Sequence, residues 1–299
     1  PGVIAVVIFY MLAGGVVTHL WHDIIPTGKH KLRRFYQDRL LRIFPLYLYI
    51  ATLTLLFLLI TSYSQPHFTP LALLNNAFII PLNYYMVIDN TILGDPSWWL
   101  IPQAWSLGAE LQAYLLLPLV LIYKRIRIAF FIISTLIYTA ANLNVIHTDY
   151  FGYRLLPGVF FIFIIGSIIK ESHSAQKTIL PRLLMSGAVI TYSLFSYFNA
   201  FKQAYTQETL LGLLIGIPLI ILANKMTIKL PSNKLAASLS YGVFLSHFLI
   251  IWCLDYTKLL TAGTWVYYLS LITLTGAVSY SGNVLIETRI NAFRRRDKG

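Results

Sequence analysis

Long apolar segments, separated by loops whose positive charge alternates, are the strongest constraint on how this chain folds. A helix needs roughly 20 mostly apolar residues to cross a bilayer. Windows of that kind occur at 2–20, 43–62, 103–123, 127–146, 155–170, 179–198, 208–224, 236–254 and 264–286 of the 299 residues. We therefore predict an all-α, polytopic transmembrane helix bundle of about nine spans. Because so little chain remains between the windows, we expect one integral membrane domain over residues 1–299.

The distribution of positive charge supports this layout and orients it. Of the 23 Lys and Arg residues, 20 follow the first, third, fifth and seventh windows or lie in the C-terminal tail. The other loops hold 3. Such alternation is the positive-inside pattern of membrane proteins. We expect residue 1 outside and the C-terminus in the cytoplasm of a multi-pass membrane protein. The net charge of +12 is then a topology signal, and we expect no nucleic-acid partner.

Composition excludes several other classes of protein. The chain is 57% hydrophobic and 11% charged, whereas soluble domains average about 25% charged residues. A single cysteine, Cys253, excludes a disulfide scaffold, and no Cys/His set has metal-binding spacing. The apolar stretch 67–90 is expected to be interfacial or re-entrant, because proline removes backbone donors that lipid cannot replace. It is interrupted or flanked by Pro66, Pro70, Pro81, Asn75, Asn76 and Asn83.

Charged side chains near the membrane are the candidates for function, because burying a charge in lipid is costly. Arg39 and Arg42 are three residues apart, which puts both guanidiniums on one face of a helix. A guanidinium binds phosphate through two parallel hydrogen bonds. One interpretation is a clamp for a phosphate-bearing cytosolic ligand, and the other is an ordinary positive flank that contacts lipid head groups.

Glu110 and His247 lie within predicted spans. Glu110 is interpreted either as a group that handles a proton or binds a substrate hydroxyl, or as a structural hydrogen-bond acceptor for Gln112, Tyr114 or a neighbouring helix. His247 has the residue type suited to a general base near neutral pH. The alternative interpretation of His247 is a packed histidine that is hydrogen-bonded to a backbone carbonyl.

Several segments, in this order, resemble the acyltransferase-3 family of integral membrane acyltransferases. The stretch from Arg39 to Tyr47 is similar to the family's Arg-x-x-Arg-Ile-x-Pro-x-Tyr signature. Residues 105–118 resemble its Trp-Ser-Leu-x-x-Glu-x-x-x-Tyr-x-x-x-Pro pattern, and residues 240–247 resemble its late Ser-Tyr to His helix. Residues 9–14 and 286–287 resemble two further family segments, with Ala13 where the family has serine.

The resemblance implies a function. It implies transfer of an acyl group, often acetyl, from acyl-CoA as co-substrate to a hydroxyl of an envelope carbohydrate or lipid-linked sugar, with no bound cofactor. Arg39, Arg42 and Tyr47 would bind the donor, and Glu110 and His247 would be catalytic. The other candidates that the resemblance supplies are Trp105, Ser106, Tyr114, Ser240 and Tyr241. Membrane lipids are the remaining expected partner, and the implied location is the bacterial inner membrane.

The family's first helix carries an arginine and a histidine, and the histidine is the proposed base. This chain begins at what resembles the second helix, so we expect the first helix, and its histidine, to be absent from these residues. The alternative function is a proton-coupled transporter or flippase of a lipid-linked glycan, with Glu110 and His247 as a proton relay. A non-catalytic membrane scaffold is a third hypothesis.

Overall fold

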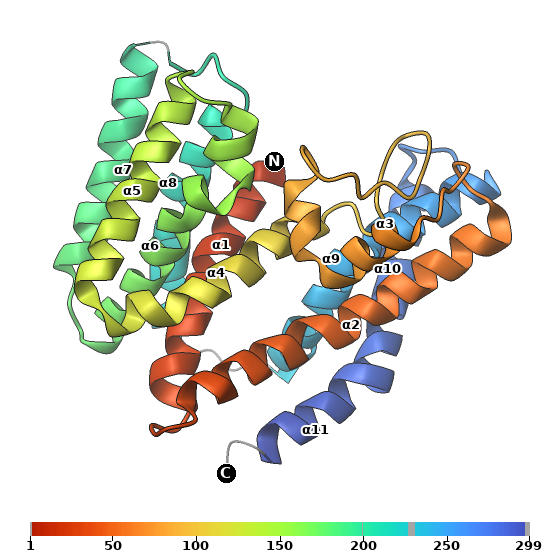
Figure 1. Ribbon diagram of the computed structural model, residues 1–299, viewed down its shortest axis with the longest axis horizontal. Helices are drawn as coiled ribbons and strands as arrows, with labels where there is room; N and C mark the ends of the chain where they lie inside the picture. The colour runs from red at the N-terminus through yellow and green to blue at the C-terminus, as the bar shows by residue number, and fades with distance from the viewer. Residues whose placement is uncertain (1, 199, 227–230, 297–299) are drawn as a thin grey trace. The chain divides into compact units, whose positions relative to one another are not determined.

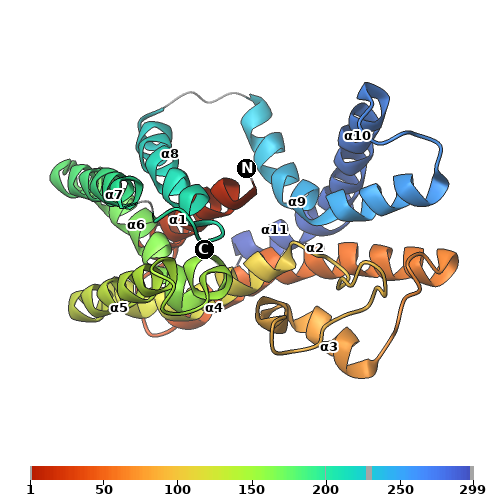
Figure 2. The same cartoon turned by 90° about the horizontal axis from the view of Figure 1, so that it is seen from above.

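The computed structural model describes residues 2–198, 200–226 and 231–296, and within them the long elements are all helices (Figures 1 and 2). The prediction of an all-α bundle is confirmed. The chain forms two compact units, Pro1–Phe35 with Ala109–Ile228 and Tyr36–Gly108 with Lys229–Gly299. That all of 1–299 is a single domain stays a prediction. Pro1 and Gly299, on which the predicted orientation of the ends rests, lie outside the described residues.

The first unit is a helical bundle built around α6. Because α6 is apolar all round, it is buried along most of its length. Helices α1, α5, α7 and α8 pack against it, as Figure 1 shows. The elements of this unit are α1 (Gly2–His19), η1 (Leu20–Ile24), most of α4 (Ala104–Ile122), α5 (Lys124–Asn142), η3 (Asp149–Arg154), α6 (Leu156–Ser174), α7 (Ile179–Tyr197) and α8 (Thr206–Lys225).

Two glycines set the close approach of α1 to α6. A Cβ at Gly14 would lie 1.9 Å from the Phe163 carbonyl oxygen, and one at Gly166 would lie 1.8 Å from the Met11 carbonyl oxygen. Neither contact is sterically possible, so the two backbones meet where side chains are missing. Small residues have this role in membrane bundles, where van der Waals packing replaces the hydrophobic effect between helices. The hydroxyls of Thr18 and Ser167 add a hydrogen bond of 2.8 Å across the same contact.

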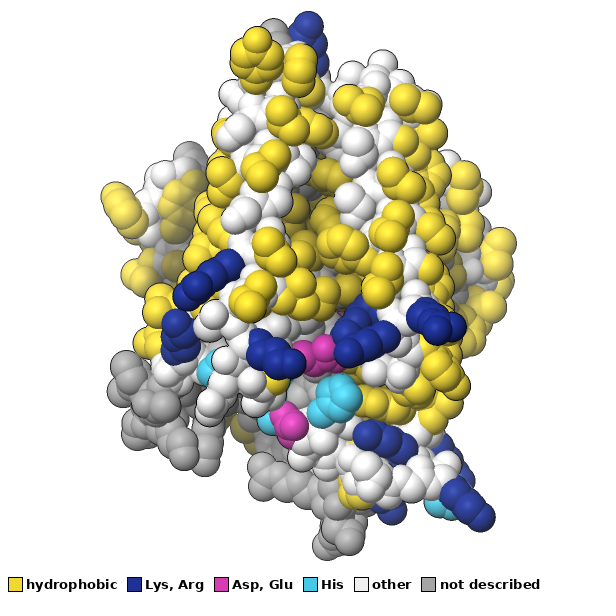
Figure 3. Space-filling view, turned by 90° about the vertical axis from the view of Figure 1, so that its left-hand side faces the viewer, with side chains coloured by type: hydrophobic (Ala, Val, Ile, Leu, Met, Phe, Trp, Pro, Cys, Tyr) yellow, Lys and Arg dark blue, Asp and Glu magenta, His cyan; other side chains and the backbone are white. Residues whose placement is uncertain are grey.

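Basic residues gather at one end of the first unit. Arg127 at the start of α5 donates to Glu171 near the end of α6 over 2.7 Å, and His22 of η1 lies 3.8 Å from the other oxygen of Glu171. The first turn of α5, the end of α6 and η1 therefore share this end. Figure 3 shows hydrophobic side chains over most of one face, with Lys, Arg, His and acidic side chains gathered toward one end. This separation is what a membrane-spanning bundle with one basic end requires.

The second unit contains two long helices, α9 and α10, which pack side by side. A Cβ at Gly242 of α9 would overlap the Ser279 side chain of α10, so this contact is also close. The elements of the unit are most of α2 (Lys31–Thr61), α3 (Pro70–Phe78), η2 (Ile80–Tyr84), the first turn of α4, α9 (Pro231–Thr257), α10 (Trp265–Gly282), η4 (Asn283–Glu287) and α11 (Thr288–Arg296).

The stretch 67–90 forms two short helices, α3 and η2, that are broken at Ile79, where φ is +66°. Asparagine side chains satisfy the irregular backbone around them. Asn76 donates to the Ala72 and Asn90 carbonyls and accepts from the Leu100 N–H. Because α3 has 9 residues, it is too short to cross a bilayer. The prediction that this stretch is not a span agrees with the structure.

Eight of the described helices are long and apolar enough to cross a membrane. They correspond to eight of the nine predicted windows, with α10 continued into η4 and α11. The ninth window, 127–146, falls on α5, which has 19 residues but is not among the eight. Lys124, Arg125 and Arg127 lie in its first turn and lower its hydropathy. The chain is thus a multi-pass membrane protein, and a ninth span at α5 stays a prediction.

Candidate functional site

Arg39 is buried in a network of charged side chains in the second unit. Its guanidinium donates to the Asp38 carboxylate over 2.5 and 3.2 Å. Arg294 of α11 donates to both oxygens of the same carboxylate over 3.0–3.1 Å. One buried carboxylate therefore joins two guanidiniums, and it holds α2 against α11.

Arg42 lies one turn further along α2 and has a different carboxylate partner. It donates to Glu287 over 2.6 Å, and Glu287 also accepts from Asn283 over 3.2 Å. The Arg42 guanidinium lies 5.4 Å from the centre of the Tyr241 ring, and the Tyr241 hydroxyl donates to the Ile43 carbonyl over 3.0 Å. The Arg42 side chain is 30% exposed, whereas that of Glu287 is 6% exposed. We refer to Arg39, Arg42 and Arg294 with Asp38 and Glu287 as the arginine cluster.

The arginine cluster has three guanidiniums and two carboxylates, so its own charge is positive. The cavity between Arg42, Pro45, Glu287 and Arg294 has a volume of about 10 Å³. That is room for about one water molecule. A phosphate group can therefore reach the cluster at the exposed part of Arg42, or by taking the place of Glu287.

Tyr47, Trp105 and Ser106, predicted as site residues, form hydrogen bonds that hold the irregular segment between α2 and α4. The Tyr47 hydroxyl donates to the Asn76 carbonyl over 2.6 Å. The Trp105 carbonyl accepts from Asn83 over 3.1 Å, and the Ser106 hydroxyl donates to the Gln103 carbonyl over 2.9 Å. All three are buried. The structure thus gives these residues positions suited to supporting the segment, and their predicted roles remain predictions.

His247 lies on α9, half-buried, with its Nδ1 2.8 Å from the Phe244 carbonyl oxygen. Gln103 Nε2 donates to the same carbonyl and to that of Leu245. When Nδ1 carries the proton and donates to this carbonyl, Nε2 holds the lone pair that a general base requires. The backbone contact matches the structural interpretation of His247, while its second nitrogen keeps the catalytic one open. Ser240 is exposed on the same helix.

Glu110 belongs to a buried polar cluster in the first unit. It accepts a hydrogen bond from Tyr114, one helical turn along α4. Glu110 and Arg154 lie close enough to Tyr10 of α1 for their charges to act on its hydroxyl. Arg154 in turn donates to Asp149 over 2.8 Å. We call these five residues the Glu110 cluster.

The hydroxyl of Tyr10 has no hydrogen-bond partner among the described residues, although the side chain is fully buried. Its ring is stacked on Phe163, with ring centres 4.6 Å apart, so its position is set by packing. A buried polar atom without a partner is costly. Sequence reasoning used Tyr10 as part of a motif and assigned no chemistry to Asp149 or Arg154. The signal it missed is that charged side chains from two elements, Glu110 of α4 and Arg154 of η3, act on the buried Tyr10 hydroxyl.

The described residues contain no group of three His, Cys, Asp or Glu side chains arranged to hold a metal ion.

Comparison with known proteins identifies the family. A family model described as an acyltransferase domain, acyltransferase-3, matches residues 2–284. The chain belongs to the acyltransferase-3 family. An uncharacterized protein of Aquifex aeolicus (strain VF5) is 46% identical over 220 residues, which are 70% of this chain and 98% of that protein. No solved structure matches the chain. The resemblance stated from the motifs is confirmed, and this family member is a membrane acyltransferase in the general sense.

Proposed function

We propose that the protein transfers an acyl group, acetyl in the first instance, from acyl-CoA to a hydroxyl of an envelope carbohydrate or lipid-linked sugar. Family membership supports the reaction class, and the arginine cluster carries the choice of donor. Its guanidiniums suit an anionic carrier, because CoA presents phosphates and arginine binds phosphate through paired hydrogen bonds.

The donor contact is argued from the charges of the cluster. Arg42 donates to Glu287 through one nitrogen, Nη1, and no other hydrogen bond of its guanidinium is made within the described part of the chain. A guanidinium has five N–H donors, so a phosphate has donors to bind on the exposed side of Arg42. Arg39 and Arg294 hold Asp38 between them and keep α2 and α11 in place behind this contact. Arg42 therefore binds the donor phosphate, and Arg39 positions the helix that carries Arg42.

The acceptor is assigned to the Glu110 cluster. A sugar hydroxyl can donate to the Glu110 carboxylate and accept from the unpartnered Tyr10 hydroxyl. During transfer, the acceptor oxygen forms a bond to the thioester carbonyl carbon and the carbon–sulfur bond breaks. The acceptor proton passes to a base, and the CoA sulfur leaves and is protonated. Glu110 and His247 are the bases that we propose from this chain.

We further propose that the basic end of the first unit faces the cytoplasm of a bacterial inner membrane. The concentration of Lys and Arg at that end supports this orientation, because cytoplasmic loops carry an excess of positive charge. Acyl-CoA is a cytosolic compound, so its phosphates would meet the protein on the cytoplasmic side.

The test uses the purified full-length protein in lipid nanodiscs, which have no transmembrane gradient. Radiolabelled acetyl-CoA is added with an extract of lipid-linked sugars and envelope carbohydrate, and covalently bound label is counted. We expect labelled product with wild type and Lys124→Ala, and a loss of ten-fold or more with Arg39→Ala. Equal activity of the two variants would refute the donor role of the cluster. Gradient-driven movement of a glycan in vesicles, with no labelled product, would favour the transporter instead.

A further inference from the structure

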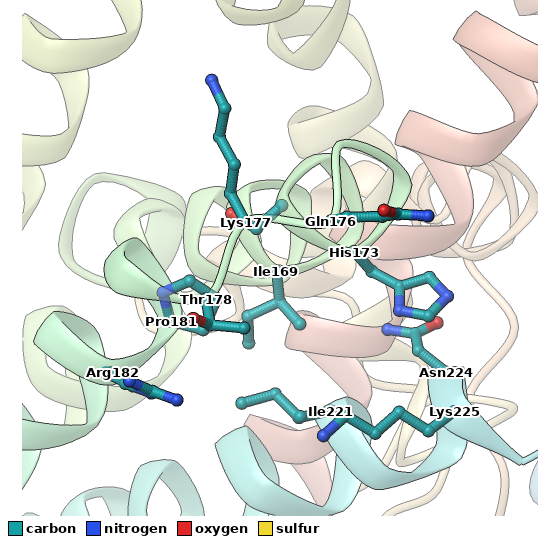
Figure 4. Close-up of a pocket in the computed structure, with 11 residues that line it drawn as sticks. Ile169, His173, Gln176, Lys177, Thr178, Pro181, Arg182, Ile221, Asn224 and Lys225 are labelled. Carbon is teal, nitrogen blue, oxygen red and sulfur yellow. The ribbon is translucent and has the colours of Figure 1, made fainter.

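A second basic site lies in the first unit, apart from the residues discussed so far. It is a cavity of about 360 Å³ at the ends of α6 and α8 and the start of α7. Figure 4 shows Arg182 of α7 and Lys225 of α8 extending toward the same space, with His173 and Asn224 beside it and Lys177 directed away. This volume is within the range of small-molecule sites.

The lining combines cations with an apolar floor. Ile169 and Pro181 are buried at the base of the cavity, and Ile221 is half-buried. None of the described residues that line it is Asp or Glu. Within the part of the chain that the structure describes, Arg182 and Lys225 have no carboxylate partner, whereas Arg127 and Arg154 of the same unit each have one. This set of side chains is therefore suited to bind an anion.

The surface beside the cavity indicates that the anion carries acyl chains. Ile179, Leu180 and Leu183 on the first turns of α7 are exposed, with Ile179 at 72%. The helices α6, α7 and α8 are all long and apolar enough to span a membrane. A molecule whose head reaches Arg182 and Lys225 therefore has an apolar helix surface along which its tails can lie. Basic pockets between membrane helices bind anionic head groups in this way.

We propose that this cavity binds the phosphate head group of an anionic phospholipid, such as phosphatidylglycerol. The phosphate accepts hydrogen bonds from Arg182 and Lys225, and the glycerol backbone rests on Ile169, Pro181 and Ile221. A soluble phosphate would use the same cations but would gain nothing from the apolar floor or from the exposed face of α7. The proposal is independent of the acyl-transfer function.

The experiment measures binding of dioleoyl phosphatidylglycerol to the protein in neutral maltoside micelles by native mass spectrometry. The test variant is R182Q/K225Q. The matched control is K124Q/R125Q, which removes two exposed cations from the start of α5. Both variants change the net charge equally. We expect affinity at least ten-fold weaker in the test variant and within two-fold of wild type in the control, with R182K intermediate.

Three results would overturn the proposal. Equal weakening in R182Q/K225Q and K124Q/R125Q would mean that the lipid responds to overall charge. Equal affinity for dioleoyl phosphatidylcholine, whose head group is zwitterionic, would mean that the cations do not select the ligand. Displacement of phosphatidylglycerol by inorganic phosphate at comparable concentration would mean that the site holds a soluble anion. Because Arg182 and Lys225 are exposed, the variants are expected to unfold at the wild-type temperature, which a melting curve checks.

Discussion

Arg42→Ala separates the two roles of Arg42 as a partner of Glu287 and as a binding group for CoA. The substitution leaves the Glu287 carboxylate, 6% exposed, with the hydrogen bond of 3.2 Å that it accepts from Asn283. Removing one member of a buried ion pair costs about 3–5 kcal/mol. Because Arg42 is 30% exposed, water replaces part of the lost interaction, and we expect a loss of about 2–3 kcal/mol in the free energy of unfolding.

The effect on CoA binding is of similar size but has a different origin. A hydrogen bond to a charged group contributes about 1.5–3 kcal/mol, so losing one such contact weakens CoA binding by about 10–150-fold. Equilibrium binding of CoA to the purified protein measures this without knowledge of the acceptor. Arg289→Ala is the control, because Arg289 is an exposed arginine on α11, two residues after Glu287. We expect that variant to bind CoA as wild type does.

A second substitution distinguishes the two roles. In R42A/E287Q no buried carboxylate is left without its guanidinium, so we expect most of the lost stability to return. CoA binding stays weak, because the phosphate partner is still missing. Glu287→Gln alone should bind CoA at least as tightly as wild type, since it removes a competitor for Arg42. If R42A/E287Q recovers both stability and CoA affinity, Arg42 serves Glu287 alone and the reasoning is wrong.

Three further predictions follow from the packing and the buried hydroxyls. Gly166→Ala should destabilise the protein by about 1–3 kcal/mol in thermal unfolding, because the added methyl overlaps the backbone of α1. The control Gly187→Ala has nothing within 4 Å of the added methyl and should be neutral or slightly stabilising in the same assay. Tyr10→Phe should leave the melting temperature unchanged or raised, because its hydroxyl lacks a partner among the described residues, while lowering acyl transfer to the acceptor. Burial and the hydrogen bond to Asp255 raise the pKa of Tyr63. The protonated hydroxyl therefore stabilises the fold fully below pH 10, and this stabilisation is lost as pH rises further. Tyr63→Phe should reduce the alkaline loss of stability in a pH series of melting curves.

The sequence was sufficient to predict the helical elements because the membrane limits the choices. Runs of apolar residues of bilayer length must be helices in lipid, since each backbone group needs a partner within its own segment. The same rule identified 67–90 as an exception from its prolines and asparagines. Hydropathy is a weaker predictor of a membrane span where the helix begins with charged residues. The α5 helix packs against α6 through one face, yet its first turn carries Lys124, Arg125 and Arg127, and composition alone does not decide whether it crosses the membrane.

The candidate residues were predictable from motifs, but their partners were not. Arg39 and Arg42 could be placed on one helical face from their spacing. Nothing in a local pattern shows that Arg294, 255 positions after Arg39, binds the carboxylate beside it, or that Asn283 shares Glu287 with Arg42. Tyr10 was equally hidden, because its missing hydrogen bond is a property of the packed bundle. Long-range pairing is set by how the helices pack, which one sequence does not encode in any short segment.

The two basic sites differ in a way that bears on their proposed ligands. In the arginine cluster, Asp38 and Glu287 compensate most of the positive charge, so an arriving phosphate gains less than it would from unpaired guanidiniums. A donor that must bind and leave in every catalytic cycle suits such a site, because strong binding of the ground state does not raise turnover. At Arg182 and Lys225, no carboxylate among the described residues lining the cavity competes for the cations. A ligand that binds there gains the full interaction with both cations, and no carboxylate among those lining residues takes its place when it leaves. That arrangement favours slow exchange of an abundant lipid over turnover of a substrate.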